Sequence, residues 1–420
     1  MTARRLAAVD AQTYWMSAKI PSDQFLVYGF DGVPKDLGAT LDALRRRANG
    51  CAPLRLRVRD RGRMRYPEWV SADVGADRFI VHASTDPSWP GCLAAVAALG
   101  YRQLDARRRP WRMHLFPGVD GPCGLRAGTV VVLQIAHALA DGVRSSALAA
   151  WLLGRADPIE AVPAVPPWAT AALPWRAYRA ARAHRRLVRD TIAGAVPAPA
   201  PSRPGLRSNT RPAGARRIAT LVRPRSALTG PTVTVVVLAA VAEALAAHLR
   251  TLGDDPAQLG AEVPLAKTGA RQAHNHFGNV AVGLYPELGR DERMARIAAE
   301  LADRRRRAAH PAMRAADRAA AAVPAALLRW GVTQFDPDLR SETVTGNTVV
   351  SSVHRGAADL RLGGAPVVFT AGYPALSPMM GLTHGVHGIG DTVAISVHAA
   401  ESAIGDFDAY VEELAAALDR

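Results

Sequence analysis

The sequence predicts an α/β protein built from two domains of similar size. Its 420 residues exceed what a single hydrophobic core ordinarily organises. Segments with helical periodicity alternate with short β-branched runs in both halves, which is the pattern of a mixed α/β fold. Between the halves, alternating Ala and Pro cannot pack as a helix. We therefore predict one domain over residues 1–190, a linker or crossover over 191–215, and a second domain over 216–420.

The elements of the first half follow from periodicity and from end signals. LGATLDALRRRANG (37–50) has helical spacing and finishes on a glycine, a common C-terminal signal. CLAAVAALGYRQL (92–104) is a second expected helix. WRMHLFPGVDG (111–121) predicts a strand followed by a turn, and TVVVLQIA (129–136) predicts a buried strand. The basic stretch 174–190 is expected to be helical.

The second half shows the same mixture of helices and strands. TVTVVVLAAVAEALAAHLR (232–250) is expected to be helical despite its β-branched start, because its alanine-rich end is too long for a strand. Short strands are expected in NVAVGLYPEL (279–288), NTVVSSV (347–353) and DTVAISVHA (391–399). The final segment, IGDFDAYVEELAAALD (404–419), is an expected amphipathic helix with an acid near its start, which suits the helix dipole.

The charge of the chain narrows the classes of function. The formal net charge is +15, but lysine occurs only at positions 19, 35 and 267, so arginine supplies nearly all of the basic residues. Arginine in place of lysine together with abundant alanine is typical of a high-GC genome, which raises the isoelectric point without any ligand. No nucleic-acid-binding motif accompanies the arginine runs, so we expect no nucleic-acid partner. The basic surface is expected to attract anionic lipid or an acidic substrate such as a CoA nucleotide.

The basic stretch 174–190 has two interpretations. Trp175 and Tyr178 could anchor it at a membrane surface, because aromatic side chains suit the water–lipid interface. Arginine nearly all around the helix also fits a solvated surface helix. Both interpretations stay open at the level of the sequence.

The cysteines and the apolar runs bear on location and cofactors. Cys51, Cys92 and Cys123 lie far apart with no CxxC spacing, which predicts neither a disulfide framework nor a zinc site. No metal or cofactor is expected. No 18-residue uncharged span and no apolar signal core are visible. We expect a cytoplasmic protein, soluble or attached peripherally to the inner membrane or to lipid droplets.

The segment QIAHALADG (134–142) carries the pattern most open to chemistry. His137 stands where a buried strand meets a turn, and a neutral imidazole can take a proton from a hydroxyl that attacks a carbonyl. Asp141 could orient that imidazole, or could fix the loop through hydrogen bonds or an arginine. Gly142 is expected to supply a backbone conformation that other residues resist. A core histidine beside an Asp-Gly turn would give the same short pattern.

Several segments together resemble the bacterial wax ester synthase/diacylglycerol acyltransferases of the chloramphenicol-acetyltransferase-like superfamily. LAAVDAQTYWM (6–16) is similar to the family's opening L-x-x-x-D-A-x-F/Y segment, and LDARRRPWRMHLFPGVDG (104–121) to its P-L-D-x-x-R-P-L-W stretch. QIAHALADG matches the motif H-H-x-x-x-D-G except at its first position. HNHFGN (274–279) and GNTVVSSVHRG (346–356) resemble a Gly-Asn segment before a strand and the C-terminal N-x-x-V-S-N-V-P-G turn.

The resemblance implies two chloramphenicol-acetyltransferase-like domains with the active site in a tunnel at their interface. His137, which falls on the second histidine of the motif, would deprotonate an acceptor alcohol that attacks an acyl thioester directly, without an acyl-enzyme. Asp141 is implied as the second catalytic-site residue, holding the loop and the histidine in geometry. The implied partners are acyl-CoA, as co-substrate, and diacylglycerol or a long-chain alcohol as acceptor.

Departures from the family pattern keep other functions open. Ala136 replaces the first histidine of the motif, Thr234 and Val235 replace an Asn-Asp pair, and the Ser-Asn-Val-Pro-Gly turn is altered over 351–356. A related transferase acting on a secondary-metabolite or glycolipid hydroxyl, with a carrier protein as alternative donor, fits these changes. A non-catalytic lipid-binding relative fits them too. The candidate substrate-binding residues are Ala136, Gly142 and Asn347, of which Asn347 could instead support the backbone of its strand.

Overall fold

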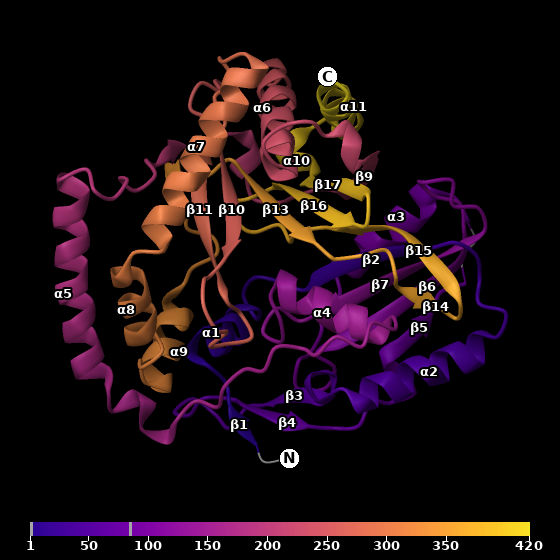
Figure 1. Cartoon of the computed structure of the whole chain (residues 1–420), viewed down its shortest axis with the longest axis horizontal. Coiled ribbons are helices and arrows are strands. Elements are labelled where there is room, and N and C mark those ends of the chain that lie inside the picture. Colours follow the sequence, from indigo (N-terminus) through magenta and orange to yellow (C-terminus); the bar gives the residue numbers. More distant parts are fainter. Residues whose placement is uncertain (1–2, 84–85) are drawn as a thin grey trace.

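Two six-stranded sheets form the framework of the protein, which is described here from a computed structural model covering residues 3–83 and 86–420 (Figure 1). The first sheet has the strand order β14-β15-β2-β7-β6-β5, and the second has the order β11-β10-β13-β16-β17-β9. Helices cover the outer parts of both sheets, and the two sheets meet near the centre of the molecule.

The first sheet is assembled from both halves of the chain. Its strands are β2 (Gln24–Phe30), β5 (Phe79–Val81), β6 (Trp111–Val119), β7 (Gly128–Ile135), β14 (Arg361–Leu362) and β15 (Ala365–Gly372). β15 pairs antiparallel with β2, with Thr370 opposite Tyr28. Residues of α2 (Leu37–Gly50) and α4 (Gly142–Leu152) pack on one face, and α3 (Trp89–Leu99) packs on the other. The second half of the chain therefore completes the sheet that the first half begins.

The second sheet carries the longest apolar helix. Its strands are β9 (Arg216–Pro224), β10 (Gly260–Ala266), β11 (Phe277–Gly283), β13 (Thr348–His354), β16 (Leu382–Ile389) and β17 (Thr392–Ala400), packed with α6 (Val233–Thr251), α7 (Arg290–Ala308) and α11 (Phe407–Leu418). α6 is long and apolar enough to cross a membrane by length and composition, although Glu243 and Arg250 mean that it is not an uncharged span. Since 72% of its most apolar window is buried inside the protein, we assign it to the core.

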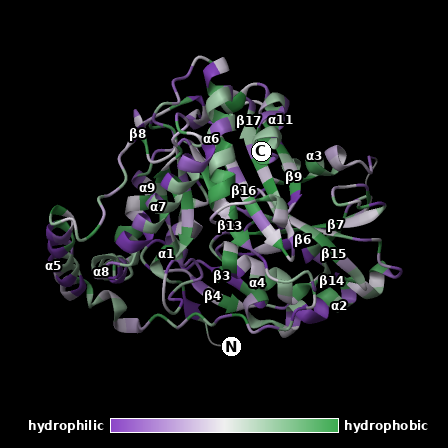
Figure 2. Cartoon of the chain, turned by 45° about the horizontal axis from the view of Figure 1, so that its top comes forward, coloured by the Kyte–Doolittle hydropathy of each residue, from purple (hydrophilic) through white to green (hydrophobic). Residues whose placement is uncertain are grey.

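The remaining elements lie around this framework. They are β1 (Arg4–Arg5), β3 (Leu56–Arg59) and β4 (Glu68–Ser71), which form a small sheet; the β8 (Arg203–Pro204) and β12 (Thr343–Val344) pair; and the helices α1 (Ala8–Met16), α5 (Leu173–Ile192), α8 (Pro311–Ala320), α9 (Ala325–Gln334) and α10 (Glu401–Ile404). α5 stands at the left edge in Figure 1, alongside α8. Figure 2 colours much of α5 as hydrophilic.

Most expected elements are present with shifted ends. The expected helix 92–104 begins earlier, as α3, because Ser88 caps it and Pro90 suits its first turn, and it ends at Leu99. Strands β2, β9, β10, β15 and β16 were not anticipated. The segment 191–215 is mostly irregular apart from β8 and a short turn of helix. The proposed division at this segment stays a prediction, and the first sheet takes β14 and β15 from beyond it.

Candidate active site

The end of β7 places one histidine at an opening in an otherwise closed region. β7 is hydrogen-bonded on both sides, to β2 and β6, as far as Ile135. Ala136 still donates its N–H to the carbonyl of Pro110 (2.8 Å), and the chain then leaves the sheet. From Gly128 to Asp141 every residue is buried except His137, which is partly exposed. The strand therefore holds His137 rigidly while leaving part of its ring accessible.

Asn275 fixes the orientation and the tautomer of the His137 ring. Its side-chain N–H₂ donates to the carbonyl of His137 (2.9 Å) and to the carboxylate of Asp10 (3.0 Å). Since a carbonyl oxygen can only accept, the amide oxygen of Asn275 must face His137 Nδ1, 2.8 Å away. Nδ1 therefore carries the hydrogen, and the lone pair lies on Nε2. A neutral imidazole in this state can accept a proton at Nε2.

The surroundings of His137 favour its neutral form. Burial lowers the pKa of His137 below its usual value, although the hydrogen bonds to its ring and the charge of Asp141 act in the opposite direction. The ring of Phe277 stacks against the imidazole, with centroids 5.6 Å apart and planes 24° apart. At neutral pH the imidazole is uncharged and ready to accept a proton.

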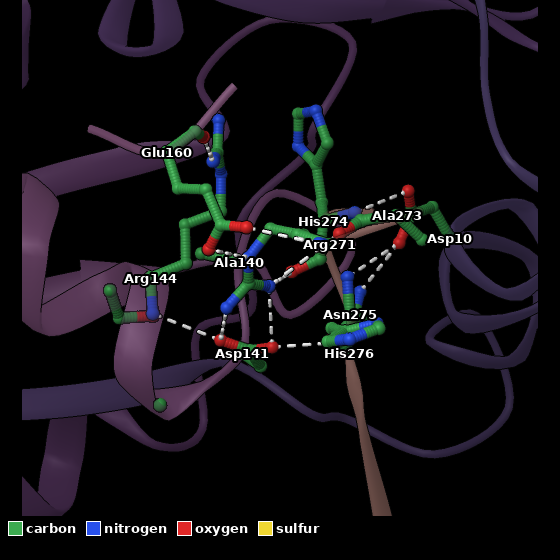
Figure 3. Close-up of polar contacts among 12 residues, drawn as sticks. Asp10, Ala140, Asp141, Arg144, Glu160, Arg271, Ala273, His274, Asn275 and His276 are labelled. Carbon is green, nitrogen blue, oxygen red and sulfur yellow. Dashed lines mark hydrogen bonds and ion pairs between the residues drawn. The ribbon is translucent and has the colours of Figure 1, made fainter. Parts of the chain in front are cut away.

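Asp10 organises the segment that carries Asn275. Its side chain is fully buried and accepts hydrogen bonds from the backbone N–H groups of His274 and Asn275 (both 2.9 Å). Burial raises the pKa of Asp10 to about 6, and these hydrogen bonds oppose part of that rise. Figure 3 shows Asp10 and Asp141 on either side of the 274–276 segment. These bonds connect helix α1 to the 274–276 segment, whose Asn275 orients His137.

Asp141 binds an arginine and two backbone groups. Its carboxylate pairs with Arg271 (2.7 and 3.3 Å) and accepts the N–H groups of Arg144 (2.9 Å) and His276 (2.8 Å), as Figure 3 shows. Both side chains of the ion pair are only 6% exposed. Burial alone would raise the pKa of Asp141, but Arg271 and the two N–H groups hold it below its usual value. In the described part of the chain Asp141 makes no hydrogen bond to His137, so its contacts match the loop-fixing role.

The structure corrects the expectation for Gly142. Gly142 begins α4 without a left-handed backbone conformation, so its φ angle is open to other residues. A Cβ atom added there would lie 3.3 Å from Cγ2 of Val353, which belongs to β13 of the second sheet. The absence of a side chain is useful because two elements from different halves of the chain approach closely at this point.

The other two candidate substrate-binding residues lie in packed surroundings. Ala136 is 7% exposed and belongs to the hydrophobic core. Asn347 is fully buried; its side-chain N–H₂ donates to Pro204 and Asn209, and its oxygen accepts from Gly260. These bonds join β13 to its neighbours, which is the supporting role that the sequence left open for Asn347.

Two departures from the family pattern contact each other. Thr234, at the start of α6, donates to the hydroxyl of Ser352 in β13 (2.9 Å). Val235, the other changed position in α6, is 2% exposed. The changes at 234 and 352 therefore form one altered patch where α6 meets β13.

Three residues of this site were not assigned roles from the sequence. Asp10 and Asn275 lie in the segments 6–16 and 274–279, which resemble family segments, and Arg271 lies just before the second of these. The pairing of Asn275 with His137 spans 138 positions in the chain, so local spacing gives no sign of it. Among the residues that the structure describes, no three His, Cys, Asp or Glu side chains are grouped as a metal site would need.

The fold is chloramphenicol-acetyltransferase-like, and two family profiles define the class of protein as an acyltransferase. The profile of the wax ester synthase/diacylglycerol acyltransferase catalytic domain matches residues 30–251, and that of the WS/DGAT C-terminal domain matches residues 274–420. The chain therefore belongs to the wax ester synthase/diacylglycerol acyltransferase family.

Solved structures share this fold over the whole chain. The wax ester synthase/diacylglycerol acyltransferase from Marinobacter aquaeolei VT8 is similar with a TM-score of 0.65 and 21% identity, covering 99% of this chain and 98% of that one. The starter condensation domain of rhizomide synthetase, solved with C8-CoA and Leu-SNAC, is similar with a TM-score of 0.61 and 16% identity, covering 100% and 94%. The first condensation domain of the CDA synthetase gives a TM-score of 0.61, 15% identity and coverage of 100% and 96%. Comparison with curated proteins gave no match.

Proposed function

We propose that this protein transfers an acyl group from acyl-CoA to the hydroxyl of an alcohol, with His137 as general base. The hydrogen bond from His137 Nδ1 to Asn275 is the observation that carries the proposal, because it leaves the lone pair on Nε2. Nε2 takes the proton of the acceptor hydroxyl while the oxygen bonds to the thioester carbonyl carbon. The carbon–sulfur bond then breaks, and the CoA thiolate takes the proton back from the imidazolium.

The relatives support a donor and an acceptor for this proposal. The condensation domain that shares this fold was solved with C8-CoA, which supports acyl-CoA as the donor. The family name supports diacylglycerol or a long-chain alcohol as the acceptor. The altered patch at Thr234 and Ser352 favours, as a second candidate, an acceptor outside storage lipids, such as a secondary-metabolite or glycolipid hydroxyl.

Thiol release across a panel of substrates tests this proposal. Medium- and long-chain acyl-CoAs are each paired with diacylglycerol, fatty alcohols and polar alcohols. We expect acceptor-dependent release of CoA by the wild type and its loss in His137→Ala. His184→Ala, which changes an exposed histidine of α5, is the matched control and should behave as wild type. Equal release by wild type and His137→Ala would remove His137 as the base, and acyl-CoA binding without turnover would favour a non-catalytic lipid-binding protein.

We propose further that α5 and α8 attach the protein to the cytoplasmic surface of an anionic membrane or lipid droplet. A groove of about 880 Å³ lies between these helices, and seven arginines line it together with Trp175 and Tyr178. Trp175 and Tyr178 are 60% and 53% exposed. Exposed aromatic rings beside a dense positive charge suit the interface of a membrane that contains anionic lipid.

Vesicle sedimentation tests the attachment. We expect the protein to sediment with phosphatidylglycerol-containing vesicles at low salt and to be released as salt rises. Arg182→Gln/Arg186→Gln should weaken sedimentation. Arg45→Gln/Arg46→Gln, which removes two exposed arginines from the distant helix α2, should leave it unchanged (Figure 1). Sedimentation that is absent, or equal for both double variants, would contradict this role for α5.

A further inference from the structure

The strands β2, β13, β15 and β16 meet where the two sheets join, and a buried arginine lies at their junction. Arg355 follows β13 directly and is 5% exposed. Its Nη1 donates to the carbonyl of Ala371 (2.9 Å) and to the hydroxyl of Thr370, both in β15. Within the described ranges 3–83 and 86–420, no carboxylate forms an ion pair with Arg355. A buried cation without a counter-charge is costly, so its presence calls for an explanation.

The edge of the guanidinium formed by Nε and Nη2 makes no hydrogen bond to a carbonyl or carboxylate of the described residues, and the Tyr28 hydroxyl interacts with the guanidinium. Nε is buried and makes no hydrogen bond, and Nη2 donates to no carbonyl or carboxylate of the described residues. Nη1 fixes the group in place. The Nε–Nη2 edge presents two parallel N–H donors, which is the geometry that binds both oxygens of a carboxylate.

Two more buried polar side chains lie near the Arg355 guanidinium. The ring of Tyr28 is fully buried, its centroid lies 5.1 Å from the guanidinium carbon of Arg355, and its hydroxyl interacts with that guanidinium and hydrogen-bonds to no other described group. His387 of β16 is 6% exposed, and its Nδ1 makes no hydrogen bond. A Cβ atom at Gly372 would lie 2.9 Å from both Arg355 Nη2 and His387 Cε1, so these two side chains converge over that glycine. Buried polar groups in folded proteins normally have partners, and here Arg355 Nε and His387 Nδ1 have none among the described residues.

The cluster belongs to the same junction as the His137 turn. His387 pairs with Val353 across β13 and β16, so both side chains point to the same face. On that face Val353 approaches Gly142 at the start of α4, five residues after His137. Arg355 also lies within the altered turn 351–356, where the chain departs from the family pattern.

We propose that Arg355, Tyr28 and His387 form a binding site for a carboxylate of the substrate. The Nε–Nη2 edge of Arg355 holds the two carboxylate oxygens, and the Tyr28 hydroxyl donates a further hydrogen bond. Because the site is buried at the junction that also carries the His137 turn, the carboxylate belongs to a hydroxy-acid acceptor or to the far end of a dicarboxylic acyl donor. The identification of the ligand as a substrate rests on the proposed acyl transfer.

Calorimetric titration of the full chain tests the site without needing turnover. The acceptor pair is ω-hydroxylaurate and dodecanol, and the donor pair is dodecanedioyl-CoA and lauroyl-CoA. We expect the wild type to bind the carboxylate-bearing member of one pair roughly 10-fold or more tightly than the neutral member. The pair that shows the difference identifies the source of the carboxylate.

Variants separate binding from a structural role. Arg355→Met should abolish the discrimination. Tyr28→Phe, which removes only one hydroxyl, should reduce the affinity difference between the members of the pair. It also tests the site if Arg355→Met does not fold. Arg203→Met is the matched control, because Arg203 is 8% exposed, has an unpartnered Nε and lies in β8, and it should keep the discrimination.

Two outcomes would overturn the inference. One is equal wild-type affinity within both pairs, and the other is discrimination that survives both Arg355→Met and Tyr28→Phe. Failure of the proposed function gives a different result, because discriminating binding would then persist with no release of CoA from any substrate pair.

Discussion

The turn after β7 and the turn after β13 reach the same junction, but they differ in whether their polar groups have protein partners. After β7, Asp10, Asp141 and Asn275 all bond to protein groups that fix His137. After β13, Arg355 keeps its buried Nε without a partner and has no counter-charge among the described residues. The first region is preorganised for a proton transfer. The second region has a buried N–H donor on Arg355 that no described protein group accepts, which suits recognition of a substrate group.

The largest effect on stability is expected at the Asp141–Arg271 pair. Asp141→Ala removes the buried carboxylate from Arg271 and leaves that guanidinium only the exposed carboxylate of Glu160, 3.5 Å away, so the free energy of unfolding should fall by about 3–5 kcal/mol. Denaturant unfolding followed by tryptophan fluorescence measures this loss. Asp141→Ala/Arg271→Met should recover part of it, because the unpaired charge is gone. A loss below 1 kcal/mol in Asp141→Ala would contradict the role of this pair in fixing the turn.

The pH dependence of the free energy of unfolding should show the contribution of Asp10. Because burial raises the folded pKa of Asp10 to about 6, above its unfolded value near 4, its contribution is fully present below pH 4. That contribution is lost as the pH rises through 6, a decrease of about 3 kcal/mol. Denaturant unfolding of wild type and Asp10→Asn at several pH values measures this contribution as the difference between their free energies of unfolding. Parallel curves for the two proteins between pH 4 and 7 would contradict the assignment.

A smaller effect is expected at Asn275, in the pH–rate profile. Asn275→Asp places a negative charge against the imidazole, which should raise the pKa of His137 and move the acidic limb of the profile up by about 1 pH unit or more. Asn275→Ala removes a hydrogen bond that raises that pKa, so the limb should move down and the rate should fall roughly 10-fold. Asn279→Ala, at an exposed neighbour, is the control. If the acidic limb of the pH–rate profile stays at the same pH in both Asn275 variants, Asn275 does not control the pKa of the base.

These two regions also show how far the sequence could predict the structure. Valine-rich 129–136 predicted β7 because an apolar β-branched run is a strong local signal, and the motif placed His137 and Asp141 at its end. Asp10, Arg271 and Asn275 were missed as partners because their contacts join segments more than 100 positions apart. β15 was missed for a similar reason, since its partner β2 lies in the other half of the chain. Local patterns carry no information about such pairings.

Single-turnover transfer from labelled acyl-CoA measures directly whether His137 acts as the general base. Wild type and His137→Ala are mixed with donor and an acceptor that the panel identifies, and the ester formed is measured over time. If His137 is the base, wild type forms ester and His137→Ala, with its fold retained, forms it at a rate at least about 100-fold lower. Ester formation at equal rates in the two proteins would contradict the assignment of His137 as the base.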